Sequence, residues 1–121
     1  MLVNAGKTIV ANLLGNLSSQ AAPIYFAYGT GTTAPTENDT TLVSEVARKA
    51  ALVYYESVLD PNDTIYIFAV FDIDTATTVR EIACFDAGTG GNMLFRELKT
   101  VSCSANSELQ LGMRITSKIT T

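Results

Sequence analysis

The chain has 121 residues, enough for one domain with a modest hydrophobic core. Its net charge of -4 argues against a nucleic-acid groove, which needs a basic surface. Histidine is absent, so the commonest general base and metal ligand is missing. No apolar run reaches the roughly 18 residues of a membrane span, and the first residues lack a signal-peptide pattern. Cys84 and Cys103 are too few for a disulfide framework, and we expect them to be small core residues.

Residues 3–17 are predicted to form an amphipathic helix that stops at Gly15 and Asn16. Its apolar positions recur at helical spacing, at Val3, Gly6, Val10, Leu13, Leu14 and Leu17. We expect this stripe to pack within its own domain, with a neighbouring subunit as the alternative.

The remainder, residues 21–121, is predicted to be β-structure. A short aromatic strand at 23–28 precedes a polar loop at 30–41. The stretch 42–59 follows, and the β-branched and aromatic residues of its second half favour a strand after a bend. Residues 60–63 read Asp-Pro-Asn-Asp, which predicts a turn.

The second half of the chain alternates more strongly. Residues 65–73 are apolar on both faces, which predicts a strand buried on both sides. After a turn at 74–78, strands at 79–85 and 93–98 are joined by a glycine-rich hairpin turn at 88–91. Residues 108–119 alternate cleanly between apolar and polar, which predicts a last strand with one wet face.

One helical segment (1–20) followed by many short strands indicates a mostly β, single domain (1–121). The predicted class is an antiparallel β-sandwich, or a jelly-roll-like barrel, with an N-terminal helix. Eight side chains are predicted to be mostly buried: Val10, Leu14, Ile67, Phe71, Phe85, Leu111, Met113 and Ile115.

Three short patterns suggest a ligand, and each is incomplete. Residues 29–34 match a dinucleotide fingerprint, but Pro35 and a polar stretch follow where a helix is needed. Residues 88–91 lack the Lys-Ser/Thr of a phosphate loop. Asp72 and Asp74 begin a calcium-loop pattern that lacks its glycine and its final glutamate. We therefore expect no cofactor, no metal and no catalytic residue, and the protein is predicted not to be an enzyme.

Glu81 is the one carboxylate placed within a mostly apolar strand. By alternation it shares the face of Val79, Ala83 and Phe85. A buried carboxylate needs a partner, and Arg48 or Arg96 could supply it. We expect a structural ion pair at this position rather than a catalytic group.

Several segments together resemble a known group of proteins. They are residues 28–36 (YGTGTTAPT), 39–42 (DTTL), 45–48 (EVAR) and 79–96 (VREIACFDAGTGGNMLFR). Over roughly residues 3–117 the chain resembles small virion proteins of tailed bacteriophages and archaeal tailed viruses, of decoration or tail-fibre-like type. Those proteins carry GTGTTAPTxxDTxLxxEVxR and ExGLFNAxxGGTMLAR blocks.

The resemblance implies a structural virion protein, assembled in the host cytoplasm and then part of the particle. The expected role is a capsid decoration or cement protein that forms a homotrimer and binds other virion proteins, such as the major capsid protein. The alternative is a tail, baseplate or fibre-attachment component. Neither nucleic acid nor a membrane is an expected partner. Ten residues are candidates for fixing or forming the contact loops 29–41 and 86–92: Gly29, Gly31, Pro35, Asp39, Glu45, Arg48, Glu81, Gly90, Gly91 and Arg96.

A third hypothesis is a carbohydrate- or receptor-binding module, which rests on fold-level analogy. Tyr25, Tyr54 and Tyr55 would be its exposed aromatic residues. Packing in the core explains these tyrosines equally well.

Overall fold

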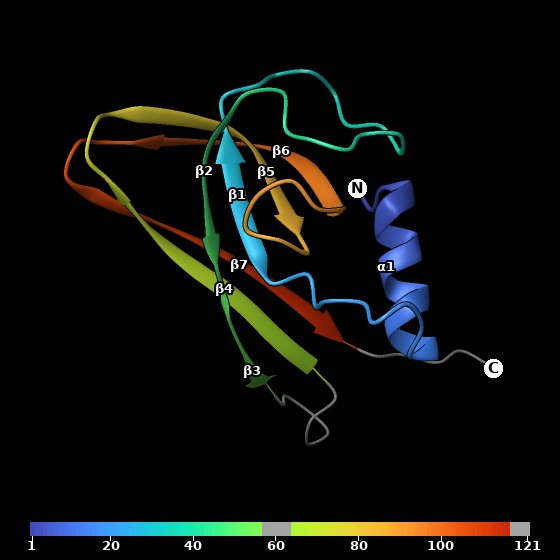
Figure 1. Ribbon diagram of the computed structural model, residues 1–121. Helices are drawn as coiled ribbons and strands as arrows, with labels where there is room; N and C mark the ends of the chain where they lie inside the picture. The colour runs from blue at the N-terminus through green and yellow to red at the C-terminus, as the bar shows by residue number, and fades with distance from the viewer. Residues whose placement is uncertain (57–63, 117–121) are drawn as a thin grey trace.

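The computed structural model describes residues 1–56 and 64–116, which contain one helix and seven strands (Figure 1). The elements are α1 (Asn4–Gly15), β1 (Tyr25–Gly29), β2 (Glu45–Ala50), β3 (Leu52–Glu56), β4 (Thr64–Ile73), β5 (Thr77–Phe85), β6 (Met93–Cys103) and β7 (Ser107–Thr116). The predicted turn at 60–63, and the predicted continuation of the last strand through Ser117 and Ile119, lie outside the described residues.

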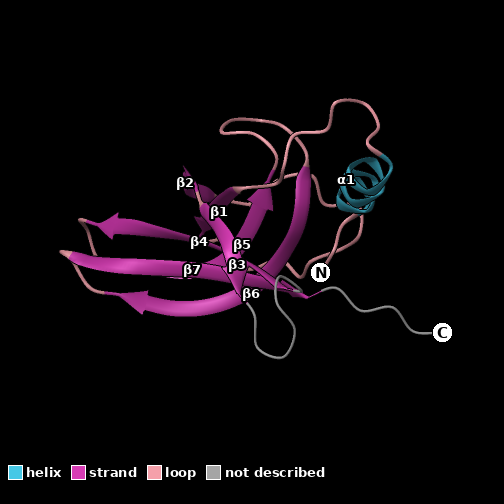
Figure 2. Ribbon diagram, turned by 90° about the horizontal axis from the view of Figure 1, so that it is seen from below, coloured by secondary structure: helices cyan, strands magenta, loops and turns pink. Residues whose placement is uncertain are grey.

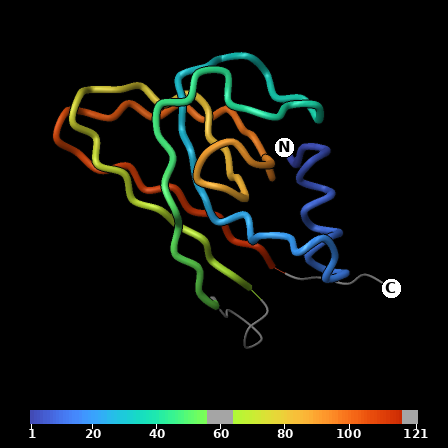
Figure 3. The backbone as a smooth tube through the Cα atoms, viewed as in Figure 1, coloured from blue at the N-terminus to red at the C-terminus, as the bar shows by residue number. Residues whose placement is uncertain are grey.

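The strands form two antiparallel sheets, ordered β2-β1-β5-β6 and β3-β4-β7. The predicted β-sandwich with an N-terminal helix is confirmed (Figure 2). The bend predicted within residues 42–59 falls at Ala51, where the chain leaves β2 and enters β3 of the other sheet. The connections from β4 to β5 and from β6 to β7 also cross between the sheets, as the backbone trace shows (Figure 3).

The main core lies between the two sheets. Phe26 and Tyr28 of β1 meet Ile67 and Phe71 of β4, and the rings of Tyr28 and Phe71 pack edge to face with centroids 5.0 Å apart. Four of the predicted core residues are buried: Ile67, Phe71, Phe85 and Leu111. Cys84 is also buried, and burial raises the pKa of its thiol to about 12, so this cysteine is a packing residue rather than a nucleophile.

A second, smaller core covers the other face of the four-stranded sheet. Ala27, Ala83 and Phe85 point to this side, where Leu42 from the long β1–β2 loop and Val3 at the start of the helix pack on them. Strand β1 and the last residues of β5 are therefore buried on both faces, by side chains from their own chain.

The helix buries only the first part of the predicted stripe. Val3 and Gly6 are buried together with Ile9, whereas Val10 and Leu14 are 40% and 85% exposed. The reason is the close approach of α1 to β6: Gly6 has no side chain and lies directly against the backbone of Leu94. That contact fixes the rotation of the helix and turns its leucines away from the core.

Two further expectations about the three-stranded sheet are wrong. Strand β4 is not buried on both sides, because Tyr66, Phe68 and Val70 on its outer face are only half-buried. Near the end of β7, Met113 is half-buried and Ile115 is 42% exposed. Within the described part of the chain, the outer face of this sheet is covered mainly by its own side chains: Tyr54 packs edge-on against the stacked rings of Tyr66 and Phe68.

Replacing Phe71 by alanine is expected to lower the free energy of unfolding by about 3–5 kcal/mol, because it opens a cavity between the sheets. Leu52→Ala is the control, since Leu52 is 64% exposed and its loss should cost no more than about 0.5 kcal/mol. Urea unfolding of both variants measures the difference. Equal costs would contradict the placement of Phe71 in the core.

Candidate functional site: a buried ion cluster beneath the β1–β2 loop

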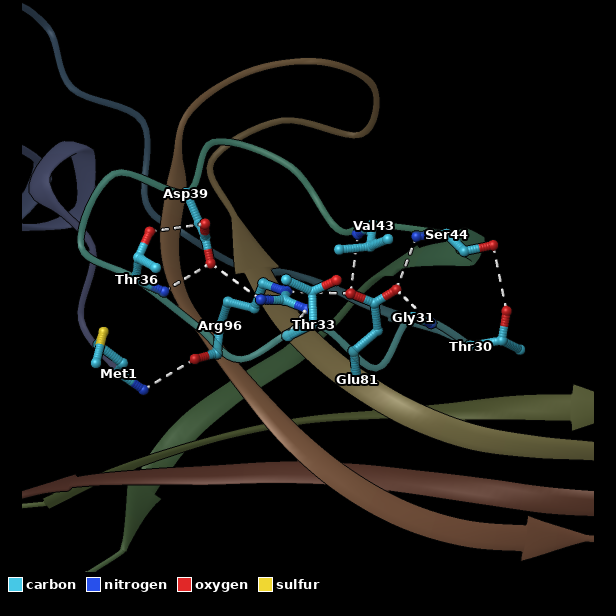
Figure 4. Close-up of polar contacts among 10 residues, drawn as sticks. All are labelled: Met1, Thr30, Gly31, Thr33, Thr36, Asp39, Val43, Ser44, Glu81 and Arg96. Atoms are coloured by element: carbon cyan, nitrogen blue, oxygen red, sulfur yellow. Dashed lines mark hydrogen bonds and ion pairs between the residues drawn. The ribbon is translucent and has the colours of Figure 1, made fainter.

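The carboxylate of Glu81 is completely buried on β5, beneath the loop of residues 30–44. It accepts hydrogen bonds from the backbone N–H groups of Gly31 and Ser44 at 2.8 Å and of Val43 at 2.9 Å. The Nε of Arg96 donates a fourth bond at 3.0 Å (Figure 4). Both ends of the loop are thus held by one side chain of the sheet below.

Glu81 points to this side by the ordinary alternation of β5, and the ladder between β5 and β6 is irregular just before it. The register shifts between Val79 and Glu81, and Val79 packs into the core between the sheets, whereas Ala83 and Phe85 pack into the smaller core. The prediction that Val79 shares the face of Glu81 is therefore wrong, because a bulge interrupts the two-residue alternation of a strand. Ala83 and Phe85 do share its side of the sheet.

Arg96 links Glu81 to the tip of the loop. Its side chain is 1% exposed, and its guanidinium donates to Glu81, to Asp39 at 3.0 Å and to the carbonyl of Thr33 at 2.7 Å. Asp39 also accepts bonds from the backbone N–H and hydroxyl of Thr36, which close a tight turn. The planar guanidinium can satisfy these three directions at once because its five donors are fixed in a fork.

Glycine is required where the loop crosses the carboxylate. A Cβ on Gly31 would lie 2.5 Å from Oε2 of Glu81, and a Cβ on Gly29 would lie 2.7 Å from the same oxygen. The dinucleotide-like pattern of residues 29–34 is therefore used for close packing. Its Gly31 N–H, which a bound phosphate would need, is already donated to Glu81.

The cluster stabilises the charged form of its carboxylates. Burial alone raises the pKa of Glu81, but the three backbone N–H groups and Arg96 outweigh it and hold that pKa below its ordinary value of 4.5. The pKa of Asp39 is lowered chiefly by the backbone N–H of Thr36, with further bonds from the Thr36 hydroxyl and Arg96. Glu81 and Asp39 are therefore anions in the folded protein at neutral pH.

A second cluster holds the turn of residues 86–92. Arg48 donates to the carbonyls of Ala87 and Gly90, pairs with Glu45 at 2.8 Å, and lies 3.5 Å above the ring of Phe85. Gly90 and Gly91 have φ angles of +58° and +71°, which other residues adopt only with strain.

The structure divides the ten predicted residues between these two clusters. Gly29, Gly31, Asp39, Glu81 and Arg96 lie together beneath and within the β1–β2 loop, while Glu45, Arg48, Gly90 and Gly91 belong to the second cluster. Pro35 lies half-buried in the first loop.

Sequence reasoning missed the groups that complete both clusters. The N–H groups of Val43 and Ser44 hold Glu81. Backbone N–H groups occur in every residue except proline, so the residue types at these positions do not reveal them as donors. Asp86 accepts from the backbone and side chain of Asn92 and from Gln20, a distant residue. Only the spacing Thr36-x-x-Asp39, typical of a side-chain-capped turn, could have been found in advance.

The sequence of the chain matches a known protein family. A sequence profile described as Podophage GP4 fiber I protein gp80 matches residues 4–118. The chain belongs to this family. No curated protein matches the chain.

The fiber I gp80 family match runs from the first residue of α1 to beyond the end of β7, so helix and sandwich are parts of one family unit. It identifies the chain as a bacteriophage structural protein associated with fibres, and at this level the prediction of a phage virion component is confirmed. In the described residues, no helix is long and apolar enough to cross a membrane.

Replacing Glu81 by glutamine is expected to lower the free energy of unfolding by about 3–5 kcal/mol, because it leaves Arg96 charged and buried without its main counter-ion. The matched control is Glu45→Gln, which removes a more exposed pair and should cost no more than about 1 kcal/mol. Urea unfolding at neutral pH measures both. A Glu81 variant as stable as the control variant would contradict the account.

Acid is expected to destabilise the protein through the same groups. Because their pKa values are lowered in the folded state, Glu81 and Asp39 contribute stability above their unfolded pKa values, and this is lost as the pH falls through the folded values. The free energy of unfolding should therefore fall between about pH 5 and pH 2. Asp39→Asn should give a shallower curve over this range, and curves of equal slope would refute the contribution of Asp39.

Proposed function

We propose that the chain is a non-catalytic structural component of a phage tail fibre that acts by binding other virion proteins. This proposal rests on the family match, because the family is named after a podophage fibre protein. The structure is consistent with it: the most perturbed carboxylates hold loops in place, and their lone pairs are directed to internal donors.

The resemblance first suggested a capsid decoration or cement protein, with the tail or fibre location as the alternative. The family description favours the alternative. Whether the protein lies on the capsid or on a tail fibre, its assembly into a homotrimer and its binding to a further virion protein remain predictions.

A carbohydrate-binding surface has less support. Tyr54 and Tyr55 are consecutive residues of β3, so they point to opposite faces of the sheet, and Tyr25 lies on the other sheet against Gly88. The three tyrosines do not form one platform. The half-exposed ring of Tyr66 is stacked on Phe68 and covered by Arg114, so its faces are already in contact with other side chains.

Locating the protein in purified virions tests the proposal. An epitope tag inserted in the exposed β6–β7 turn, at residues 104–106, keeps clear of both clusters. Gold-labelled antibody should decorate the tail fibres of tagged particles and leave untagged particles unlabelled. Label spread over the capsid would replace the proposal by the decoration role, and absence of the protein from virions would refute both.

A further inference from the structure

Strand β7 is the outer strand of the three-stranded sheet, and only one of its two sides is paired (Figure 1). All ten of its residues pair with β4 in one continuous register. Within the described chain, the backbone of residues 107–113 makes no hydrogen bond to any strand other than β4. In an antiparallel edge strand, every second residue points its N–H and C=O groups away from the paired strand. These outward groups can bind the backbone of a further strand.

The other edge strands of the described chain are shorter, irregular or already covered. Strands β2 and β3 have six and five residues. Strand β6 has two register shifts against β5, and backbone hydrogen bonds join Leu94 to Val3 and Arg96 to Met1 along its outer side. Shortness, bulges and covering segments are the usual protections of a sheet edge. Strand β7 has none of these protections and contains no proline.

A cleft of about 550 Å³ lies between β7 and β6, and residues 107–112 of β7 line it. Its lining is mixed: Leu109 and Leu111 are apolar, whereas Ser102 and Gln110 are polar. Neighbouring residues of an added strand would point to opposite faces of the sheet. The cleft therefore fits an extended segment in which apolar and polar residues alternate.

The same edge carries two negative charges without a counter-ion among the described residues. Glu108 lines the cleft, and the register between β4 and β7 places Asp72 directly opposite it. Both residues are exposed, and neither forms an ion pair with a described residue. Lys99 of β6 lines the other wall of the cleft and pairs with neither carboxylate. Like charges on opposite residues of a sheet repel, so a cation beside them is favourable.

We propose that the open side of β7 binds an extended segment of another virion protein, which adds to the sheet as a strand and places a lysine or arginine beside Glu108. The outward backbone groups select an extended polypeptide, and the acidic pair selects a basic one. The net charge of -4 favours a cationic partner over a second copy, which would carry the same charge. The inference rests on the proposed function and deepens it by naming the binding site and the chemistry of the partner.

A photo-reactive amino acid at position 110 of the full chain tests the proposal in purified virions. Gln110 is exposed on β7 and follows Glu108 on the same face, so its side chain would lie beside an added strand. Mass spectrometry should identify a cross-linked segment of another virion protein that carries a lysine or arginine. The matched control is position 52, because Leu52 is exposed on β3 at the opposite edge of the same sheet. Position 52 should not cross-link to that segment.

Four results overturn the proposal while the protein is present in virions. They are cross-links between copies of this chain alone, a cross-linked segment without a basic residue, no cross-link from position 110, and equal cross-linking from positions 52 and 110. None of these results changes where gold label lies on the particle, so the inference can fail while the proposed function stands. Absence of the protein from virions refutes the proposed function, and the inference falls with it.

Reversing the charge at residue 108 tests the role of the acidic pair. Glu108→Lys should lower the cross-link yield from position 110 at least about tenfold, because the new lysine repels a basic segment. The variant should fold by circular dichroism, since its lysine lies opposite Asp72. Glu108→Gln should act in the same direction by less. The matched control, Glu97→Lys, changes an exposed residue of β6 that does not line the cleft. Equal yields from the two lysine variants would contradict the proposal.

Hydrogen exchange separates strand addition from contact through side chains alone. Every second backbone amide between Ser107 and Met113 points away from β4 and should exchange rapidly in the purified chain. In virions these amides should exchange at least about tenfold more slowly, because an added strand accepts their hydrogen bonds. Unchanged exchange together with a cross-link from position 110 would show docking by side chains and would overturn the added strand.

Discussion

The hydrogen bonds to the buried carboxylate of Glu81 are the interaction on which the 30–44 loop and the smaller core depend. Removing a charge from water is costly, and the protein offsets this cost with three backbone N–H groups and one guanidinium. The donors come from both ends of the 30–44 loop, so the loop must lie across the sheet for the carboxylate to be satisfied. Leu42 and Phe85 are covered as a consequence.

Because the loop is held in this way, the two sheets differ in how their outer faces are covered. The four-stranded sheet is covered on its outer face over β1 and the end of β5 by its own loop and by the start of α1, whereas Val46 on its edge strand β2 is exposed. The three-stranded sheet has only its own aromatic residues on its outer face, and α1 presents leucines away from the core. Within the described chain, exposed apolar side chains lie on the helix and the three-stranded sheet, and also at Val43 and Val46 and at Leu98 and Val101 of β6.

The class of fold could be predicted because strand alternation and turn residues are local properties. The helix face could not, since residues 3–17 are apolar on more than one face and the choice depends on Gly6 meeting the backbone of β6. The side of the sheet occupied by Val79 was mispredicted because a bulge depends on the partner strand as well as on β5. Glu81, Arg96 and Asp39 could be selected as candidates by residue type, but the donors of Gly31, Val43 and Ser44 are backbone atoms that any sequence possesses.

Amide hydrogen exchange of the folded protein at neutral pH tests the role of Glu81 most directly. The N–H groups of Gly31, Val43 and Ser44 lie outside the strands, and each is donated to the Glu81 carboxylate. These three amides should exchange as slowly as the strand amides of β5. Exchange at the rate of an unprotected peptide at all three positions would show that the carboxylate does not hold the loop.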